Sequence, residues 1–231
     1  MCFPLVGLAA EKGRNVYVSP KLLYGLAYMK DVRFQGNENG GSGWSSYESR
    51  LGSRYDSTVG GSVALGYDFF GKHRVPVRAE VEYALFSRAK VQQRFDCGGC
   101  YSDTAQSQQV QTLFINASWD FRNGTRITPY VGAGLGAAFV RTKGDYGTTE
   151  SGPWLTSATG SKTVTNLAWN LGFGFGYQVS DRVSIDAGYR FAGLGKVGTR
   201  WKEWDDVDGG WHMKTKNLYQ HQLGVGMRFG F

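Results

Sequence analysis

The strongest constraint on this chain is a two-residue alternation of apolar with polar or small side chains, which recurs in eight segments. In the segment 131–139, Val131, Leu135 and Phe139 alternate with glycines, and the other segments repeat the pattern with Ser, Asn, Gln or single charges. Successive side chains of a β-strand point to opposite faces, so this pattern predicts strands with one apolar and one polar face. The eight segments are 16–28, 59–69, 77–85, 112–121, 131–139, 166–177, 183–191 and 219–231.

The polar face of these segments differs from that of a soluble sandwich, where the solvent side carries Lys, Glu and Thr. Small residues with scattered opposite charges suit the crowded inside of a narrow barrel, and the apolar face then contacts lipid. Strands of about 12 residues, tilted about 40°, cross a hydrocarbon layer of about 25–30 Å. We therefore predict an all-β fold, an eight-stranded antiparallel transmembrane β-barrel, because closure pairs every backbone group.

The links between the segments alternate strictly in length. Short links are predicted at 70–75, 122–128 and 178–181, and long polar links at 30–57, 87–109, 141–164 and 194–218. Outer-membrane barrels sort their connections in this way, with short turns in the periplasm and longer loops outside. The prediction is one barrel domain, 15–231, with four long outer loops, three short periplasmic turns and both termini periplasmic.

Two features of the strands refine this prediction. Aromatic residues gather at both ends of the segments, as expected for girdles at the two membrane surfaces. Pro20 lies inside the first segment and cannot donate to a ladder, so we expect either a bulge there or a later strand start. The predicted periplasmic girdle is Tyr67, Phe69, Trp119, Phe121, Tyr177, Phe229 and Phe231, and the outer girdle is Tyr28, Phe139, Trp169, Phe191 and Tyr219.

The N-terminal residues 1–14 differ in character from the rest of the chain. They begin MCFPLVGLAA, an apolar run ending in small residues, like the tail of a secretory signal but without a basic start. We predict a signal-peptide remnant with a short extension, and hence export; an ordinary apolar terminus is the alternative. No run of about 18 apolar residues is present for a transmembrane helix. The net charge of +7 is spread without a basic block, which argues against nucleic-acid binding.

Three segments of the second half resemble one family. The run 127–139 (ITPYVGAGLGAAF), the stretch 169–191 and the C-terminal run 222–231 (QLGVGMRFGF) are similar to strands five to eight of opacity-type, small surface-antigen outer-membrane barrels. The first half matches only in architecture. The resemblance implies a bacterial outer-membrane location, adhesion to host surfaces in some members, and a terminal Phe231 that the outer-membrane insertion machinery reads. Such barrels are also often labelled porins.

Charged residues on the predicted inner face form a candidate lumen network. Strand neighbours place Arg78 between Asp68 and Asp120, and Asp186 beside Arg228. A salt-bridged plug is the favoured interpretation, because an eight-stranded barrel is just wide enough for its side chains to fill it. A proton or ion path through the same residues is the alternative. The full set is Asp68, Arg78, Glu80, Glu82, Asp120, Asp186, Arg190 and Arg228.

The predicted long loops supply candidate contact residues. Trp44 and Tyr47 lie in the first loop, and Trp201, Trp204 and Trp211 lie in the fourth among charged residues. Exposed Trp and Tyr side chains are typical anchors of binding surfaces. Packing against one another, or insertion into the lipid headgroup layer, is the competing interpretation.

Cys97 and Cys100 stand in the second predicted loop, separated by two glycines. Outside the cytoplasm we expect them to form a short disulfide. Reduced thiols, or a site shared with a metal, are the alternatives, and a single C-x-x-C pair is only half of a zinc site.

The sequence thus predicts a non-enzymatic surface-interaction protein, adhesin-like, that acts through its outer loops. Its expected partners are outer-membrane lipid, the insertion machinery and a host or surface ligand, as a monomer without cofactor, metal or nucleic acid. A small-solute porin is the first alternative. An outer-membrane hydrolase is the second, since His212 lies close to Asp206 and Asp208, although no serine motif accompanies it.

Overall fold

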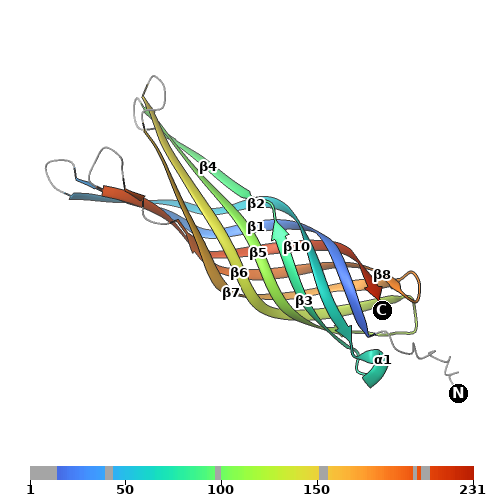
Figure 1. Ribbon diagram of the computed structural model, residues 1–231. Helices are drawn as coiled ribbons and strands as arrows, with labels where there is room; N and C mark the ends of the chain where they lie inside the picture. Colours follow the sequence, from blue (N-terminus) through green and yellow to red (C-terminus); the bar gives the residue numbers. More distant parts are fainter. Residues whose placement is uncertain (1–14, 40–43, 97–99, 151–155, 200–201, 204–208) are drawn as a thin grey trace, which may run out of the picture.

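The computed structural model describes residues 15–39, 44–96, 100–150, 156–199, 202–203 and 209–231. This part of the chain is almost entirely β-strand, with one short helix (Figure 1). The elements are β1 (Val16–Asn39), β2 (Trp44–Asp68), α1 (Phe70–His73), β3 (Val77–Phe86), β4 (Ala89–Asp96), β5 (Cys100–Asp120), β6 (Ile127–Glu150), β7 (Thr156–Gln178), β8 (Val183–Gly198), β9 (Lys202–Glu203) and β10 (Gly209–Gly230).

Eight of these strands close into an antiparallel barrel. Their order is β1-β2-β3-β5-β6-β7-β8-β10, and β10 pairs back onto β1 from Tyr17–Gly230 to Glu38–Gly209. β4 pairs with β5, and β9 pairs with β10. The prediction of an all-β, eight-stranded closed antiparallel barrel is confirmed.

The two faces of the barrel wall follow the predicted alternation. Along each wall strand, the apolar side chains at alternate positions point outward and are exposed, as for Leu22, Leu135 and Val225. The opposite phase is buried inside, as for Glu82 and Asn170. Exposed leucine and valine cover the wall between the rims, which is the surface a hydrocarbon layer requires.

One end of the barrel, here called the turn end, carries three short links as predicted. The first contains α1, whose last residue is followed by Arg74 in the left-handed region (φ 58°). The second is built on Asn123-Gly124, where Gly124 has φ 71° and the Asn123 side chain accepts bonds from the Thr125 amide and hydroxyl. Within the described residues, no helix is long and apolar enough to cross a membrane.

The other end is here called the arm end. The four long links lie there in the predicted order, but they consist largely of β-strand rather than loop. β1 continues to Asn39 and β2 begins at Trp44, and β6 and β7 likewise reach Glu150 and Thr156. These extensions carry only isolated apolar residues, such as Val32 and Val140, so they lack the regular apolar alternation that revealed the wall strands. Backbone pairing in water needs no apolar face, and the ladder therefore continues past the region that the pattern marks.

The extensions separate into two arms (Figure 1). The β2–β3 ladder ends at Gly60–Phe86 and the β7–β8 ladder ends at Trp169–Gly193. Beyond these pairs, β1, β2 and β10 form the first arm together with β9 and the end of β8, and β4 to β7 form the second. β3 and β4 are divided at residues 87–88, where the arms diverge; β3 covers the predicted third strand, and β4 lies within the predicted second long link.

Side-chain hydrogen bonds close the wall at both places where the ladder ends. The Asn166 amide donates to the carbonyls of Leu194 (2.9 Å) and Lys196 (2.8 Å) across the β7–β8 boundary. At the β2–β4 boundary, the Val59 amide donates to the Ser87 hydroxyl at 3.0 Å. These bonds satisfy backbone groups that a strand neighbour no longer reaches.

Pro20 causes neither a bulge nor a later start of β1. It pairs with Val63 of β2 in an unbroken register. The ladder to β10 omits Ser19 and Pro20 and resumes at Lys21–Gly226 in the same register. The missing N–H is accommodated by a local gap in one ladder.

We expect a charge on the middle of the apolar face to destabilise the barrel in lipid. Val225 lies on the exposed face of β10, midway between Tyr219 and Phe231. Val225→Arg should lower the free energy of unfolding in phospholipid vesicles by about 2–4 kcal/mol, measured by urea titration. Ser161→Arg, on an exposed arm residue, is the control and should change it little. Equal effects of the two substitutions would contradict the assignment of the lipid face.

Candidate functional site: the lumen and the outer arms

The centre of the lumen holds a buried ionic cluster around Lys21. Its ammonium lies 3.0 Å from Glu80 and 2.7 Å from Glu82. Glu82 also accepts a bond from Arg190 at 2.7 Å. Tyr17 donates its hydroxyl to Glu80 at 2.6 Å. β1, β3 and β8 thus each contribute a charge, and the cluster ties together strands on different sides of the barrel.

A second layer of ion pairs lies toward the turn end. The Arg78 Nε donates to both carboxylate oxygens of Asp120, at 2.9 Å each, and the Arg78 guanidinium lies 3.5 Å from Glu80. Arg228 pairs with Asp186 from the neighbouring strand. Buried charges are tolerated when paired in this way, and removing one partner leaves the other uncompensated.

The structure brings most of the predicted lumen residues together, with one difference. Arg78 contacts Asp120 and not Asp68, although Asp68 is its cross-strand neighbour. Asp68 instead accepts a bond from Arg122 at 2.6 Å. Asp68 is the last residue of β2 and Arg122 follows β5, so their side chains meet at the barrel mouth rather than inside.

Lys21 and Tyr17 are lumen residues that the sequence prediction missed. Both lie on the inward phase of the first segment, where Lys21 is the one charged residue. One signal in the sequence could have revealed Lys21 and Tyr17: the predicted network had too few cations near Glu80 and Glu82 to pair with both carboxylates. Pairing the carboxylates by strand neighbour alone could not show it, because Lys21 reaches across from β1 to β3.

A polar cavity of about 100 Å³ adjoins the ionic cluster. Its walls include Lys21, Glu82, Asn116, Asp186 and Arg190. Asn170 donates to Asn116 at 2.9 Å across this part of the lumen. The cavity holds space for a few water molecules, which is small for a solute path.

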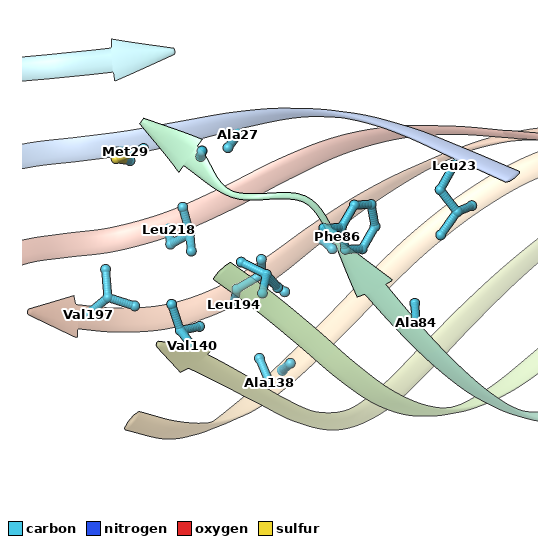
Figure 2. Close-up of a cluster of buried hydrophobic side chains, with 14 of the residues drawn as sticks. Leu23, Ala27, Met29, Ala84, Phe86, Ala138, Val140, Leu194, Val197 and Leu218 are labelled. Carbon is cyan, nitrogen blue, oxygen red and sulfur yellow. The ribbon is translucent and has the colours of Figure 1, made fainter. Parts of the chain in front are cut away.

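Above the cavity, toward the arm end, apolar side chains fill the lumen (Figure 2). The largest are Phe86, Phe114, Met29, Leu194 and Leu218, each no more than 1% exposed. They come from five different strands and point toward one another inside the barrel. This apolar plug was not predicted from the sequence. The full cluster is Leu23, Ala27, Met29, Val32, Ala84, Phe86, Ala89, Val110, Phe114, Ala138, Val140, Ala168, Ala192, Leu194, Val197 and Leu218.

Stacked aromatic rings form a row around the outside of the barrel at the base of the first arm. Tyr55 stacks on Tyr28 with centroids 4.7 Å apart, and Tyr28 on Tyr219 at 6.3 Å. Tyr219 stacks on Phe191 at 5.6 Å, and Phe191 meets Trp169 edge-on at 5.8 Å. The row crosses β2, β1, β10, β8 and β7 and includes four members of the predicted outer girdle.

The loop candidates lie only partly within the described structure. Trp201, Trp204 and Cys97 fall outside the described residues. Trp44 begins β2, Tyr47 lies in β2, Trp211 lies in β10 and Cys100 begins β5, but their side chains are not described. The binding role of the aromatic residues and the disulfide therefore stay predictions.

His212, the residue of the hydrolase hypothesis, is part of a strand ladder. It lies in β10 opposite Gln35 of β1 and is half-buried. Burial, together with the charge of Lys214, lowers the pKa of His212 from its ordinary value. Asp206 and Asp208 lie outside the described residues. In the described part of the chain, no three His, Cys, Asp or Glu side chains gather as metal ligands would.

Comparison with known proteins connects this architecture to a family. Residues 8–229 match the family model described as the outer membrane protein beta-barrel domain. The outer membrane protein PagN of Salmonella typhimurium is 33% identical over 151 residues, 64% of this chain and 62% of that protein. A Rickettsia bellii protein named "Putative adhesin" is 28% identical over 57% of this chain and 58% of its own length. The chain thus spans about 60% of the length of these curated relatives.

Among solved structures, the outer membrane protein OprG from Pseudomonas aeruginosa is similar in fold. The TM-score is 0.51 at 14% sequence identity, and the match covers 95% of this chain and 98% of that one. Identity this low relates the two proteins through the barrel fold alone.

The buried ionic cluster yields a stability prediction. Lys21→Met leaves Glu80 and Glu82 without their shared cation, so we expect the free energy of unfolding to fall by about 3–5 kcal/mol. Urea unfolding in detergent micelles measures the change. The control is Arg50→Gln, which removes an exposed pair with Glu48 at 3.6 Å and should have little effect. A Lys21→Met protein as stable as the parent would show that the carboxylates have another source of compensation.

The apolar plug yields a conductance prediction. The parent protein should give no ion-conducting steps in a planar bilayer, because Phe86 and Phe114 close the lumen. Shortening both to alanine should produce steps by removing the two largest side chains of the plug. Leu135→Ala with Leu167→Ala, on the exposed face, is the matched control and should stay silent. Steps in the parent that change with Glu80→Gln or Arg228→Gln would contradict this and support a pore.

Proposed function

The chain belongs to the outer membrane protein beta-barrel domain family, and we propose that this integral outer-membrane barrel is an adhesin-like, non-enzymatic protein that binds surface ligands through its two arms. Two described features support the proposal. The lumen is filled by ion pairs and by the apolar plug, and the arms extend the strands well beyond the aromatic row. The observation that carries it is the plug, because a closed lumen leaves the projecting arms as the accessible part of the molecule.

The relatives supply independent support for this proposal. Rickettsial relatives carry the name of adhesins, and PagN is named as an outer membrane protein. The ligand we propose is a molecule of a host cell or of another surface, and the predicted aromatic anchors Trp44, Tyr47, Trp201, Trp204 and Trp211 are its candidate contacts. No cofactor takes part in such binding.

The small-solute pore is the competing function. The polar cavity of about 100 Å³ favours it, and the apolar plug above that cavity opposes it, since a continuous wet path must pass Phe86 and Phe114. We therefore place the pore second. The hydrolase comes third, because His212 is held within a strand ladder.

Insertion and processing complete the proposal. Phe231 is 69% exposed, and its backbone amide donates to the Val16 carbonyl at 3.0 Å. An exposed terminal aromatic residue at the barrel seam is accessible to the insertion machinery, which is the role we propose for it. Residues 1–14 lie outside the described residues, and we propose them as a signal remnant with an extension. We propose a monomer.

Shortening the arms tests the proposed function. The first arm is shortened by replacing 36–47 and 199–213 each with Asn-Gly, which joins the cross-strand pairs Gln35–Glu48 and Gly198–Lys214 and removes all five candidate contacts. The second arm is shortened by replacing 148–156 with Asn-Gly, which joins the pair Gly147–Ser157. We expect a non-adherent bacterium expressing the parent to attach to cultured epithelial cells. Loss of the arm that carries the ligand site should return attachment to the level of the empty vector.

The two truncations act as controls for each other, since each removes an arm tip and keeps the barrel wall. Folding is checked by the shift in gel migration on heating, which is typical of intact outer-membrane barrels. Attachment that persists after both tips are removed would overturn the proposal.

A further inference from the structure

Three exposed lysines lie side by side on adjacent strands at the base of the first arm. Lys30 is in β1, Lys216 in β10 and Lys196 in β8, and all three side chains are exposed. Lys30 pairs with Asn217, the neighbour of Lys216, in the β1–β10 ladder. Lys216 and Asn217 in turn stand opposite Lys196, between the pairs Thr215–Val197 and Leu218–Gly195. We call this group the lysine triad.

The lysine triad coincides with irregularities in the wall that direct its side chains outward. The β10–β8 register shifts between Thr215 and Leu218, so two residues of β10 oppose one of β8. Gly195, beside Lys196, has φ 83°, a left-handed conformation that a side chain would strain. Asp31, beside Lys30, also has a positive φ of 54° where the β1–β2 register shifts. Bulges of this kind re-aim neighbouring side chains.

The lysine triad has one acid close to it, Asp31, which interacts electrostatically with Lys216 but does not form an ion pair with it. Within the described residues, none of the three ammonium groups forms an ion pair. Asp31 is the adjacent carboxylate, and it is held by Arg33 through two bonds of 3.1 and 2.6 Å. Three unpaired cations therefore stand close together on the outside of the barrel.

The aromatic row sets the depth of the lysine triad in the membrane. Tyr28, Tyr219 and Phe191 stack on the same three strands, and Tyr28 precedes Lys30 by two residues on the outward face. Below them, Tyr189 and His221 are hydrogen-bonded at 2.7 Å and continue the aromatic surface. Tyrosines of this kind mark the headgroup level of a barrel, so the lysines lie at or just above the headgroups.

We propose that the lysine triad binds the phosphate groups of the phosphorylated glycolipid that forms the outer leaflet of this membrane. The arm end faces the outer leaflet, and three neighbouring exposed ammonium groups complement a headgroup with two phosphates. The aromatic row contacts the sugar and upper acyl region of the same lipid. This site is separate from the arm tips and does not depend on the proposed adhesion.

Titration with bisphosphorylated lipid A tests the proposal. The full chain is refolded in a zwitterionic detergent, and bound lipid is counted by native mass spectrometry. We expect the combined change Lys30→Gln, Lys196→Gln and Lys216→Gln to weaken binding by about tenfold or more, since each lysine near a charged surface adds to the attraction. Dephosphorylated lipid A should bind the parent as weakly as lipid A binds the variant.

The matched control removes three exposed cations from the turn end, Lys72→Gln, Arg74→Gln and Arg126→Gln, and should bind lipid A as the parent does. Gel migration on heating confirms that both variants fold. Equal loss in the control, or no loss in the lysine variant, would overturn the proposal. Inorganic phosphate that occupies the site as tightly as lipid A, or a sulfated polysaccharide that the lysines bind in its place, would overturn it by identifying a different ligand.

Discussion

The closed ladder of backbone hydrogen bonds is the constraint on which the rest of this structure depends. A strand edge cannot face hydrocarbon with unpaired N–H and C=O groups, and the pairing of β10 with β1 removes that edge. Closure with eight strands then fixes a narrow lumen that side chains must fill. The wall outside is apolar because lipid surrounds it, and the glycines of the inner face give the buried charges and rings room. Gly134, for example, lies where an added Cβ would clash with Asn116 and Asn170.

The lumen is divided into two chemically different halves. Toward the turn end, Lys21, Arg78 and their carboxylate partners hold strands together by paired charges. Toward the arm end, the apolar plug takes their place, and it is flanked by buried uncharged polar side chains such as Gln108, Thr142 and Gln220. In such a barrel, the packed interior within the membrane supplies stability. The parts beyond the membrane surface are available for contact with other molecules.

Much of the wall was predictable because each strand there faces two different environments. Leu135 alternates with its flanking glycines because one face of the strand contacts lipid and the other faces a crowded lumen. The arms were not predictable as strands, because their few apolar residues do not follow a regular alternation. The plug was missed for a related reason: Phe86 and Phe114 are apolar residues on the inward phase, where the pattern predicts polar ones. Lys21 was on the expected face, but its partners lie on β3, the next strand but one, rather than on a neighbouring strand.

The ends of the two broken ladders have a mechanical consequence. Asn166 on one side and Ser87 on the other satisfy the last backbone groups before the arms diverge. Beyond these points the arms share no strand pairing within the described residues. Each arm is therefore a separate extension of the barrel wall. One hydrogen bond also joins the arms near their base, from the Lys90 amide of β4 to the Asp56 carboxylate of β2. A load applied to one arm therefore reaches the other through the barrel wall and through this bond. Beyond this base the two arms are separate along their length, so under the proposed function each arm tip meets a surface on its own.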